Sequence, residues 1–298
     1  MAIQHLGLVT ESSEVPRADL MKVSAALQKQ SSRDVEPIWG VSSTVDPFDK
    51  LEDVPDGYWP MIIMDDIGFD GAAGIHLDRD GQPFALITAD GELDTWSLTA
   101  SHEMIEMLVD PFGKQQVTGD SPKSDQGRVS FLVEACDPSE AADFAYSVNG
   151  ILVSDFYTPN FFDPVKADGV RYSFTGAIPG PRTILKGGYL SWTDPVSRHL
   201  WQQMWPLDAP APDFFDRGPA PPDQASLRIF SDSFTGNLTA QALRRGRDRA
   251  AQAGRPLQEG KGSSSYGNAQ AWRAQISEIV ARRGAGAARK SVRRKTRR

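Results

Sequence analysis

The stretch "WSLTASHEMIEMLVDP", residues 96–111, decides how this sequence is interpreted, because it combines helix-forming residues with side chains that bind metals. His102 and Glu106 are four positions apart, so a helix places both on one face, where they can reach one ion from successive turns. The stretch therefore predicts a helix with two possible metal ligands at the rim of a cleft. Apolar side chains on the neighbouring face would anchor it in the core: Leu98, Ile105 and Val109.

Glu103 and Glu106 define the chemistry that such a helix predicts. In hydrolases with an H-E-x-x-H helix, the glutamate after the first histidine takes a proton from a metal-bound water, whose pKa the ion lowers to about 7. Glu103 occupies that position, while Glu106 replaces the second histidine. A carboxylate makes the ligand set harder, so we expect Zn²⁺ but also consider another divalent metal. The alternative is an ordinary helix with a hydrogen-bonded histidine, since the motif is short.

A third ligand is expected from "LVEACDP", residues 132–138, which follows the helix in the sequence. Glu134 and Asp137 point to opposite faces of a regular strand, so both can coordinate only if the strand bulges or ends between them. Glu134 lies within the predicted strand and is the first choice. Asp137 is a second ligand or a neighbour of the site, and its alternative role is an Asp-Pro turn.

Two further residues are weaker candidates for the same site. His76 lies in the strand-like "GIHLD", where it either supplies an additional ligand beside the helix or is a half-exposed strand histidine. Tyr157 follows a predicted hairpin, and its hydroxyl could donate to the oxyanion of a tetrahedral intermediate. The alternative role of Tyr157 is that of a packed aromatic side chain.

The pattern of the remaining chain predicts an α+β fold. We expect a twisted, mixed or mainly antiparallel sheet, with the active-site helix and an N-terminal helix within 17–39 on one face. Ser97 is expected to cap the active-site helix, which should end at Asp110 because a proline follows. Hairpins are expected at Asp80-Gly81 and Asn149-Gly150. The predicted strand segments are 61–64, 72–78, 83–89, 129–138, 144–159, 172–178 and 187–192.

Composition places the chain among globular proteins. Of its 298 residues 40% are hydrophobic and 9% aromatic, which is enough for a sizeable core. No apolar run approaches the roughly 20 residues of a membrane helix, and the N-terminus does not resemble a signal peptide. Cys136 is the single cysteine, which excludes an intrachain disulfide and suits a reducing compartment. We therefore predict a cytoplasmic protein.

Charge and proline content divide the chain into four parts. Residues 1–204 are predicted to form the metal-binding domain, 205–226 a Pro-rich linker or strap, 227–283 a small helical C-terminal arm, and 284–298 a disordered basic tail. Nine basic residues and no acid occur in 282–298, which leaves about −16 for the rest of the chain. The tail is predicted to contact nucleic acid or an acidic protein surface, or to act as a solubilising end.

The most specific segments resemble a group of bacterial proteins with an S-H-E-x-x-E-M-x-x-D-P signature. These look like diverged relatives of the zincin metallopeptidases. The resemblance covers about residues 20 to 200, and the helix and "VEACDP" are its most specific parts. It implies that Glu106 belongs to the family pattern, together with a paired E-x-x-D at Glu134 and Asp137. It is carried by "ALQKQSSRDVEPIWG" (26–40), "GIHLDRDGQPFALI" (74–87), "WSLTASHEMIEMLVDPFG" (96–113) and "FLVEACDPSEAADFAYSVNGILVSDFYTPNFFDP" (131–164).

Two functions are compatible with the sequence. The first is a metal-dependent hydrolase that cleaves a protein or peptide, with Glu103 activating the metal-bound water. The second is a non-catalytic domain that a metal stabilises, used for binding or assembly. A Glu103→Gln substitution separates them, because it abolishes activity in the first and has no effect in the second.

Overall fold

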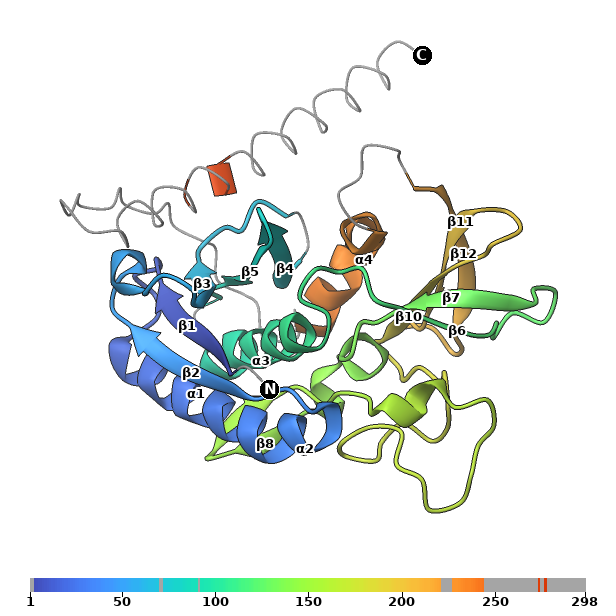
Figure 1. Ribbon diagram of the computed structural model, residues 1–298, viewed down its shortest axis with the longest axis horizontal. Helices are drawn as coiled ribbons and strands as arrows, with labels where there is room; N and C mark the ends of the chain where they lie inside the picture. Colours follow the sequence, from blue (N-terminus) through green and yellow to red (C-terminus); the bar gives the residue numbers. More distant parts are fainter. Residues whose placement is uncertain are drawn as a thin grey trace, which may run out of the picture.

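A computed structural model describes residues 3–69, 72–90, 92–220 and 227–243, together with 273, 276 and 277, and the side chains of the last helix up to 235 (Figure 1). The predicted basic tail, 284–298, and most of the predicted C-terminal arm lie outside these residues. In the part that the structure describes, no helix is long and apolar enough to cross a membrane.

The N-terminal half is built around a five-stranded sheet with strand order β2-β1-β3-β5-β4. Four of its strands are parallel, and β4 runs antiparallel to β5 at the edge. The predicted hairpin at Asp80-Gly81 joins β4 to β5, with both residues at positive φ. The strands are β1 (Gln4–Thr10), β2 (Ser43–Phe48), β3 (Trp59–Met64), β4 (Gly74–Arg79) and β5 (Gln82–Thr88).

Two helices cover one face of this sheet, as predicted. They are α1 (Arg17–Gln30) and α3 (Leu93–Val109). The N-terminal helix continues as a π-helical turn (Ser31–Val35) and as α2 (Glu36–Trp39). Side chains alternate across each strand, so β4 turns Ile75 and Leu77 to the opposite face and His76 toward α3.

Ser97 does not cap α3, contrary to the prediction. The helix begins one turn earlier, at Leu93, and the Ser97 hydroxyl donates to the backbone carbonyl of Leu152 over 2.9 Å. The C-terminal end agrees with the sequence: Val109 is the last helical residue, and the Asp110 amide closes the helix on the carbonyl of Glu106.

A buried polar network fixes α3 to α1. Ser101, which directly precedes His102, donates to Gln30 Oε1 over 2.7 Å and accepts from the Ser154 amide over 2.9 Å. Gln30 in turn donates to the Ser154 carbonyl over 3.1 Å. Since these groups are buried, their mutual hydrogen bonds hold α3 in one rotational position.

The second half of the fold is a separate antiparallel sheet, whereas the sequence suggested only one. Its strand order is β12-β11-β10-β7-β6. The strand predicted over 129–138 ends at Leu132, and the segment 172–178 contributes only an isolated bridge, between Tyr157 and Ser173. The strands are β6 (Gln116–Asp120), β7 (Arg128–Leu132), β10 (Tyr189–Thr193), β11 (His199–Met204) and β12 (Asp213–Pro219).

Smaller elements complete the molecule. The predicted hairpin at Asn149-Gly150 is formed by β8 (Tyr146–Val148) and β9 (Ile151–Val153), and β9 packs on α3. Part of the predicted linker is β12, which pairs with β11. Helix α4 (Leu227–Leu243) lies between the two large sheets, above α3 (Figure 1). The architecture is therefore α+β, with mixed and antiparallel sheets.

Candidate functional site

Helix α3 presents its motif residues to a buried polar cluster rather than to an open cleft. Glu103 is 4% exposed and Glu106 is fully buried, so the prediction that they line a cleft rim is wrong in this state of the protein. His102 is slightly more accessible than these two glutamates, with 12% of its side chain exposed. The reason is that segments from three other parts of the chain pack over this face of the helix.

The segment after β7 brings Asp137 to His102. The Oδ1 atom of Asp137 lies 3.1 Å from His102 Nε2, and Glu106 Oε1 lies 3.4 Å from the same nitrogen. Asp137 begins a short 3-10 turn (Asp137–Ser139), so the chain has already left the strand when it reaches this residue. A close packing fixes the turn: a Cβ atom at Gly188 would lie 2.6 Å from the Asp137 carbonyl oxygen.

These separations match those of ligands around one small ion. Zinc bonds to nitrogen and oxygen are about 2.0–2.2 Å long, so two ligand atoms at a tetrahedral angle are about 3.3–3.6 Å apart. The Glu106 and Asp137 oxygens fall close to that range, measured from His102 Nε2. Glu140 extends the group, because its carboxylate, the His102 ring and Asp137 have ligand atoms within 4.8 Å of one another.

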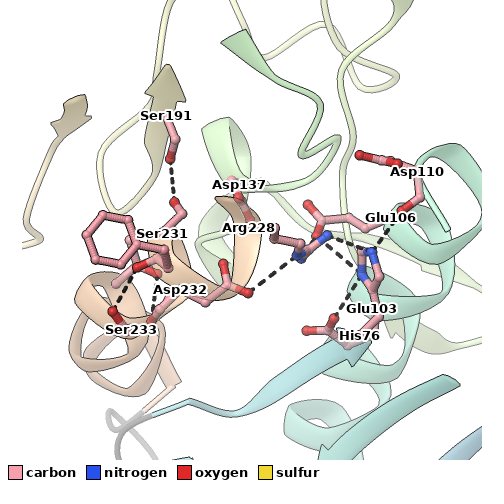
Figure 2. Close-up of polar contacts among 12 residues, drawn as sticks. His76, Glu103, Glu106, Asp110, Asp137, Ser191, Arg228, Ser231, Asp232 and Ser233 are labelled. Carbon is pink, nitrogen blue, oxygen red and sulfur yellow. Dashed lines mark hydrogen bonds and ion pairs between the residues drawn. The ribbon is translucent and has the colours of Figure 1, made fainter. Parts of the chain in front are cut away.

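The second oxygen of Glu106 faces the opposite side of the cluster. Arg228, near the start of α4, pairs with Glu106 Oε2, and its Nη1 atom lies 2.9 Å from His76 Nε2. The guanidinium also contacts Asp232 Oδ2 over 3.4 Å, one helical turn further along α4. Figure 2 shows Arg228 reaching from α4 toward α3 and β4. Glu106 therefore joins a His102 side and an Arg228 side.

Glu103 and His76 face each other on the Arg228 side. His76 Nδ1 lies 3.6 Å from Glu103 Oε2 and 3.9 Å from Glu106 Oε2. The approach of β4 to α3 depends on Gly74, where a Cβ atom would lie 2.7 Å from Glu103 Oε1. Of the two roles considered for His76, the structure favours the one beside the site, since the ring is only 2% exposed.

Several polar atoms in this cluster have no hydrogen-bond partner among the residues that the structure describes. They are Glu134 Oε1, Asp137 Oδ2, Glu103 Oε2, His76 Nδ1 and the Tyr157 hydroxyl. Each belongs to a buried residue, and leaving a buried polar atom unpaired costs about 1–3 kcal/mol. Atoms of this kind that converge on one place indicate a site for a bound ion or polar ligand.

The electrostatic shifts show an excess of carboxylates. Burial raises the pKa of Glu103 to about 8, and burial together with the nearby Asp137 raises the pKa of Glu134. Burial opposes ionisation of Glu106 as well, but Arg228 and His102 hold its pKa well below the usual range. For His102, burial is outweighed by the Glu106 carboxylate and its neighbours, which raise the imidazole pKa.

Tyr157 lies close to the same carboxylates. Burial, and then the charges of Glu106 and Glu134, raise the pKa of its hydroxyl well above the usual value. The hydroxyl is therefore protonated and able to donate. Glu134 and Tyr157 thus belong to the cluster, although Asp137 and not Glu134 is the residue in contact with His102.

No family model, curated protein or solved structure matches the chain. Assignment of a function therefore depends on the arrangement of the site residues.

Arg228 and Asp232 were not identified by the sequence analysis. They are four residues apart on one face of α4, which is the spacing of an ordinary surface ion pair. Nothing in the local sequence indicates that Arg228 reaches Glu106 on α3, more than a hundred residues earlier. Gly74 and Gly188 were also missed, because a glycine required for close packing resembles any other glycine.

Proposed function

We propose that this protein is a metal-dependent hydrolase, with zinc as the expected ion and peptide bonds as the substrate. One observation carries the proposal. His102 Nε2 faces carboxylate oxygens of Glu106 and Asp137 at 3.4 and 3.1 Å, inside a buried cluster of unpaired polar atoms. Those three side chains would hold the ion, and Glu134 or Glu140 would complete the set.

The charge of the cluster supports a cation at this position. Arg228 is its one permanent positive charge among the described residues, and an isolated buried carboxylate is costly unless it is paired or protonated. A divalent cation would let two more of the clustered carboxylates ionise, because it offsets two negative charges. The carboxylates of the cluster are Glu103, Glu106, Glu134, Asp137 and Glu140, which are buried, and Asp232, whose side chain is 14% exposed.

Glu103 and Tyr157 would carry the proton transfers. A bound divalent ion supplies Lewis acidity, which lowers the pKa of water and polarises a substrate carbonyl. Glu103 would accept the proton of the attacking water at Oε2, its unpaired oxygen, and pass it to the departing amine. The protonated hydroxyl of Tyr157 would donate a hydrogen bond to the negative oxygen that forms on the substrate.

An extended peptide is the substrate that fits the position of β4. This strand is at the edge of its sheet, with no strand on its outer side among the described residues, and it carries His76 into the site. A free strand edge offers backbone N–H and C=O groups to an added strand. A peptide bound along β4 would pass beside α3, which favours peptide hydrolysis over hydrolysis of a small molecule.

The test is hydrolysis of an unfolded protein substrate by metal-free and zinc-loaded protein. We expect fragments only from the zinc-loaded protein. Cleavage should stop when a chelator is added and resume with excess metal. The hydrolase proposal would be contradicted if the protein bound one zinc per chain but cleaved none of a panel of unfolded proteins. That outcome would still support the metal site.

The burial of the site favours one other candidate, a domain that a metal stabilises without catalysis. In that case metal should raise the melting temperature of both the wild type and the Glu103→Gln variant, and neither should cleave a substrate. The hydrolase proposal predicts the same stabilisation of both proteins but cleavage by the wild type alone.

A further inference from the structure

The candidate site is closed in this structure. Glu106 is fully buried, Asp137 is 1% exposed and Glu103 is 4% exposed, so a peptide cannot reach them without a rearrangement. Helix α4 provides much of the cover, because Arg228 and Asp232 extend from it into the cluster (Figure 2). A hydrolase built on this site therefore requires α4 to move.

Helix α4 is held mainly by polar contacts. At one end Arg228 binds Glu106, and one turn later Ser231 Oγ lies 2.8 Å from Ser191 Oγ and 2.9 Å from Gln202 Nε2. Among the side chains described for α4, Ile229 packs against the small apolar cluster on the far face of the first sheet, and none belongs to the main core. Water can replace polar contacts at little net cost, so release of α4 costs less than opening of the core.

Arg228 also controls the hydrogen bonding of His76. The Nε2 atom of His76 lies 2.9 Å from Arg228 Nη1 and 3.0 Å from the Asp110 carbonyl oxygen. One nitrogen cannot accept from the guanidinium and donate to the carbonyl at the same time. With α4 docked, Nε2 accepts from Arg228. With α4 released, the proton can move to Nε2, which then donates to the Asp110 carbonyl oxygen. Nδ1 is then unprotonated, and its lone pair faces Glu103 and Glu106.

We propose that α4 is a built-in plug, in which Arg228 occupies the site as an intramolecular cation and must leave before a peptide substrate binds. This inference rests on the proposed function. In the closed state the guanidinium pairs with Glu106 Oε2 and leaves Oε1 facing His102, so a metal ion can remain bound while docked α4 excludes peptide and chelator. By linkage, a ligand that binds only the open state shifts the equilibrium toward it in proportion to its concentration.

A reversible cross-link tests the plug in the full-length protein. Ser191→Cys and Ser231→Cys together place two sulfurs where hydroxyl oxygens now lie 2.8 Å apart, and a disulfide between them ties α4 to β10. The reduced form of the same variant is the matched control. We expect oxidation to slow the chelator-driven loss of zinc at least tenfold and to abolish peptide cleavage, with both recovered on reduction.

Arg228→Gln supplies the complementary variant. It replaces the guanidinium with a shorter, uncharged polar side chain, and we expect faster zinc exchange and faster cleavage than in the wild type. The plug would be overturned if the oxidised double variant exchanged zinc and cleaved peptide as fast as its chemically reduced form.

Hydrogen exchange of residues 227–235 keeps this test separate from the proposed function, because it needs neither metal nor activity. An undocked helix of this length is marginal in water, so release of α4 exposes its amides to exchange. We expect these amides to exchange at least tenfold faster than those of α3, and to slow when the cross-link forms. Exchange of α4 at the same rate as α3, unchanged by the cross-link, would contradict the plug even if zinc binds.

Discussion

Arg228 and Glu106 are 122 positions apart in the sequence and form an ion pair at the centre of the buried cluster. The pair leaves Glu106 Oε1 facing His102, where the Cys136 amide also donates to it over 3.0 Å. One carboxylate thus receives a guanidinium on one oxygen, and an amide and an imidazole on the other. Both the proposed metal site and the proposed plug depend on this division of Glu106.

Glu103→Gln should abolish hydrolysis and preserve metal binding. The amide has the same shape but accepts no proton, so kcat should fall by about 10²–10⁴-fold, the usual contribution of a general base. Kinetics on a fluorogenic peptide, with zinc content measured in the same sample, check this. Glu92→Gln, in the loop that precedes α3, is the control. A fully active Glu103→Gln variant would rule out the assigned base.

Gly74→Ala should destabilise the protein and disturb Glu103. An added Cβ atom would lie 2.6 Å from Thr99 Cγ2 and 2.7 Å from Glu103 Oε1. Overpacking of this kind costs about 1–3 kcal/mol, which urea unfolding can measure. Gly127→Ala is the matched control, because its Cβ atom would meet nothing within 4 Å. Equal stability of the two variants would show that β4 and α3 do not approach as closely as described.

Ser101→Ala should weaken the attachment of α3 to α1. The substitution removes the donor to Gln30 Oε1 and the acceptor of the Ser154 amide, and leaves both partners buried. We expect a loss of about 1–3 kcal/mol in the free energy of unfolding. Ser32→Ala is the control, since the exposed Ser32 hydroxyl donates to the backbone carbonyl of Gln28 within its own helical turn. A loss no larger than that of the control would refute the structural role of Ser101.

The stability of the metal-free protein should fall as pH rises from about 4.5 to 8. Burial raises the pKa of Glu103 to about 8, whereas its value in the unfolded chain is near 4.5. Between these values the unfolded chain ionises and the folded protein keeps its proton, so the folded state loses stability by at most about 1.4 kcal/mol per pH unit for this group. Glu103→Gln should reduce the slope, measured by urea unfolding with a chelator present. Identical slopes would contradict a buried, protonated Glu103.

The sequence predicted the motif helix and its neighbours because these features are local. Periodicity located α3, an Asp-Gly turn located the β4–β5 hairpin, and an Asn-Gly turn located the β8–β9 hairpin. The start of α3 was misplaced at Ser97, since a serine can cap a helix or bond to a neighbouring strand, and only the packing of β9 decides.

The contacts that complete the site were beyond sequence reasoning. The choice between Glu134 and Asp137 depended on where β7 ends, and it ends at Leu132, before both residues. Burial of the cluster depends on α4, whose position relative to α3 is a tertiary feature with no local signal. The closed state of the site therefore could not be anticipated from the motif.

The most direct test of the central claim is the metal content of purified protein by elemental mass spectrometry. The variants are His102→Ala and Asp137→Asn, with His199→Ala as control, because His199 pairs with Asp216 on the surface, 2.9 Å away, far from the motif in sequence. We predict about one zinc per chain in the wild type and the control, and loss of metal in both site variants. Wild-type protein that takes up no divalent metal, even from excess, would contradict the metal site and the hydrolase built on it.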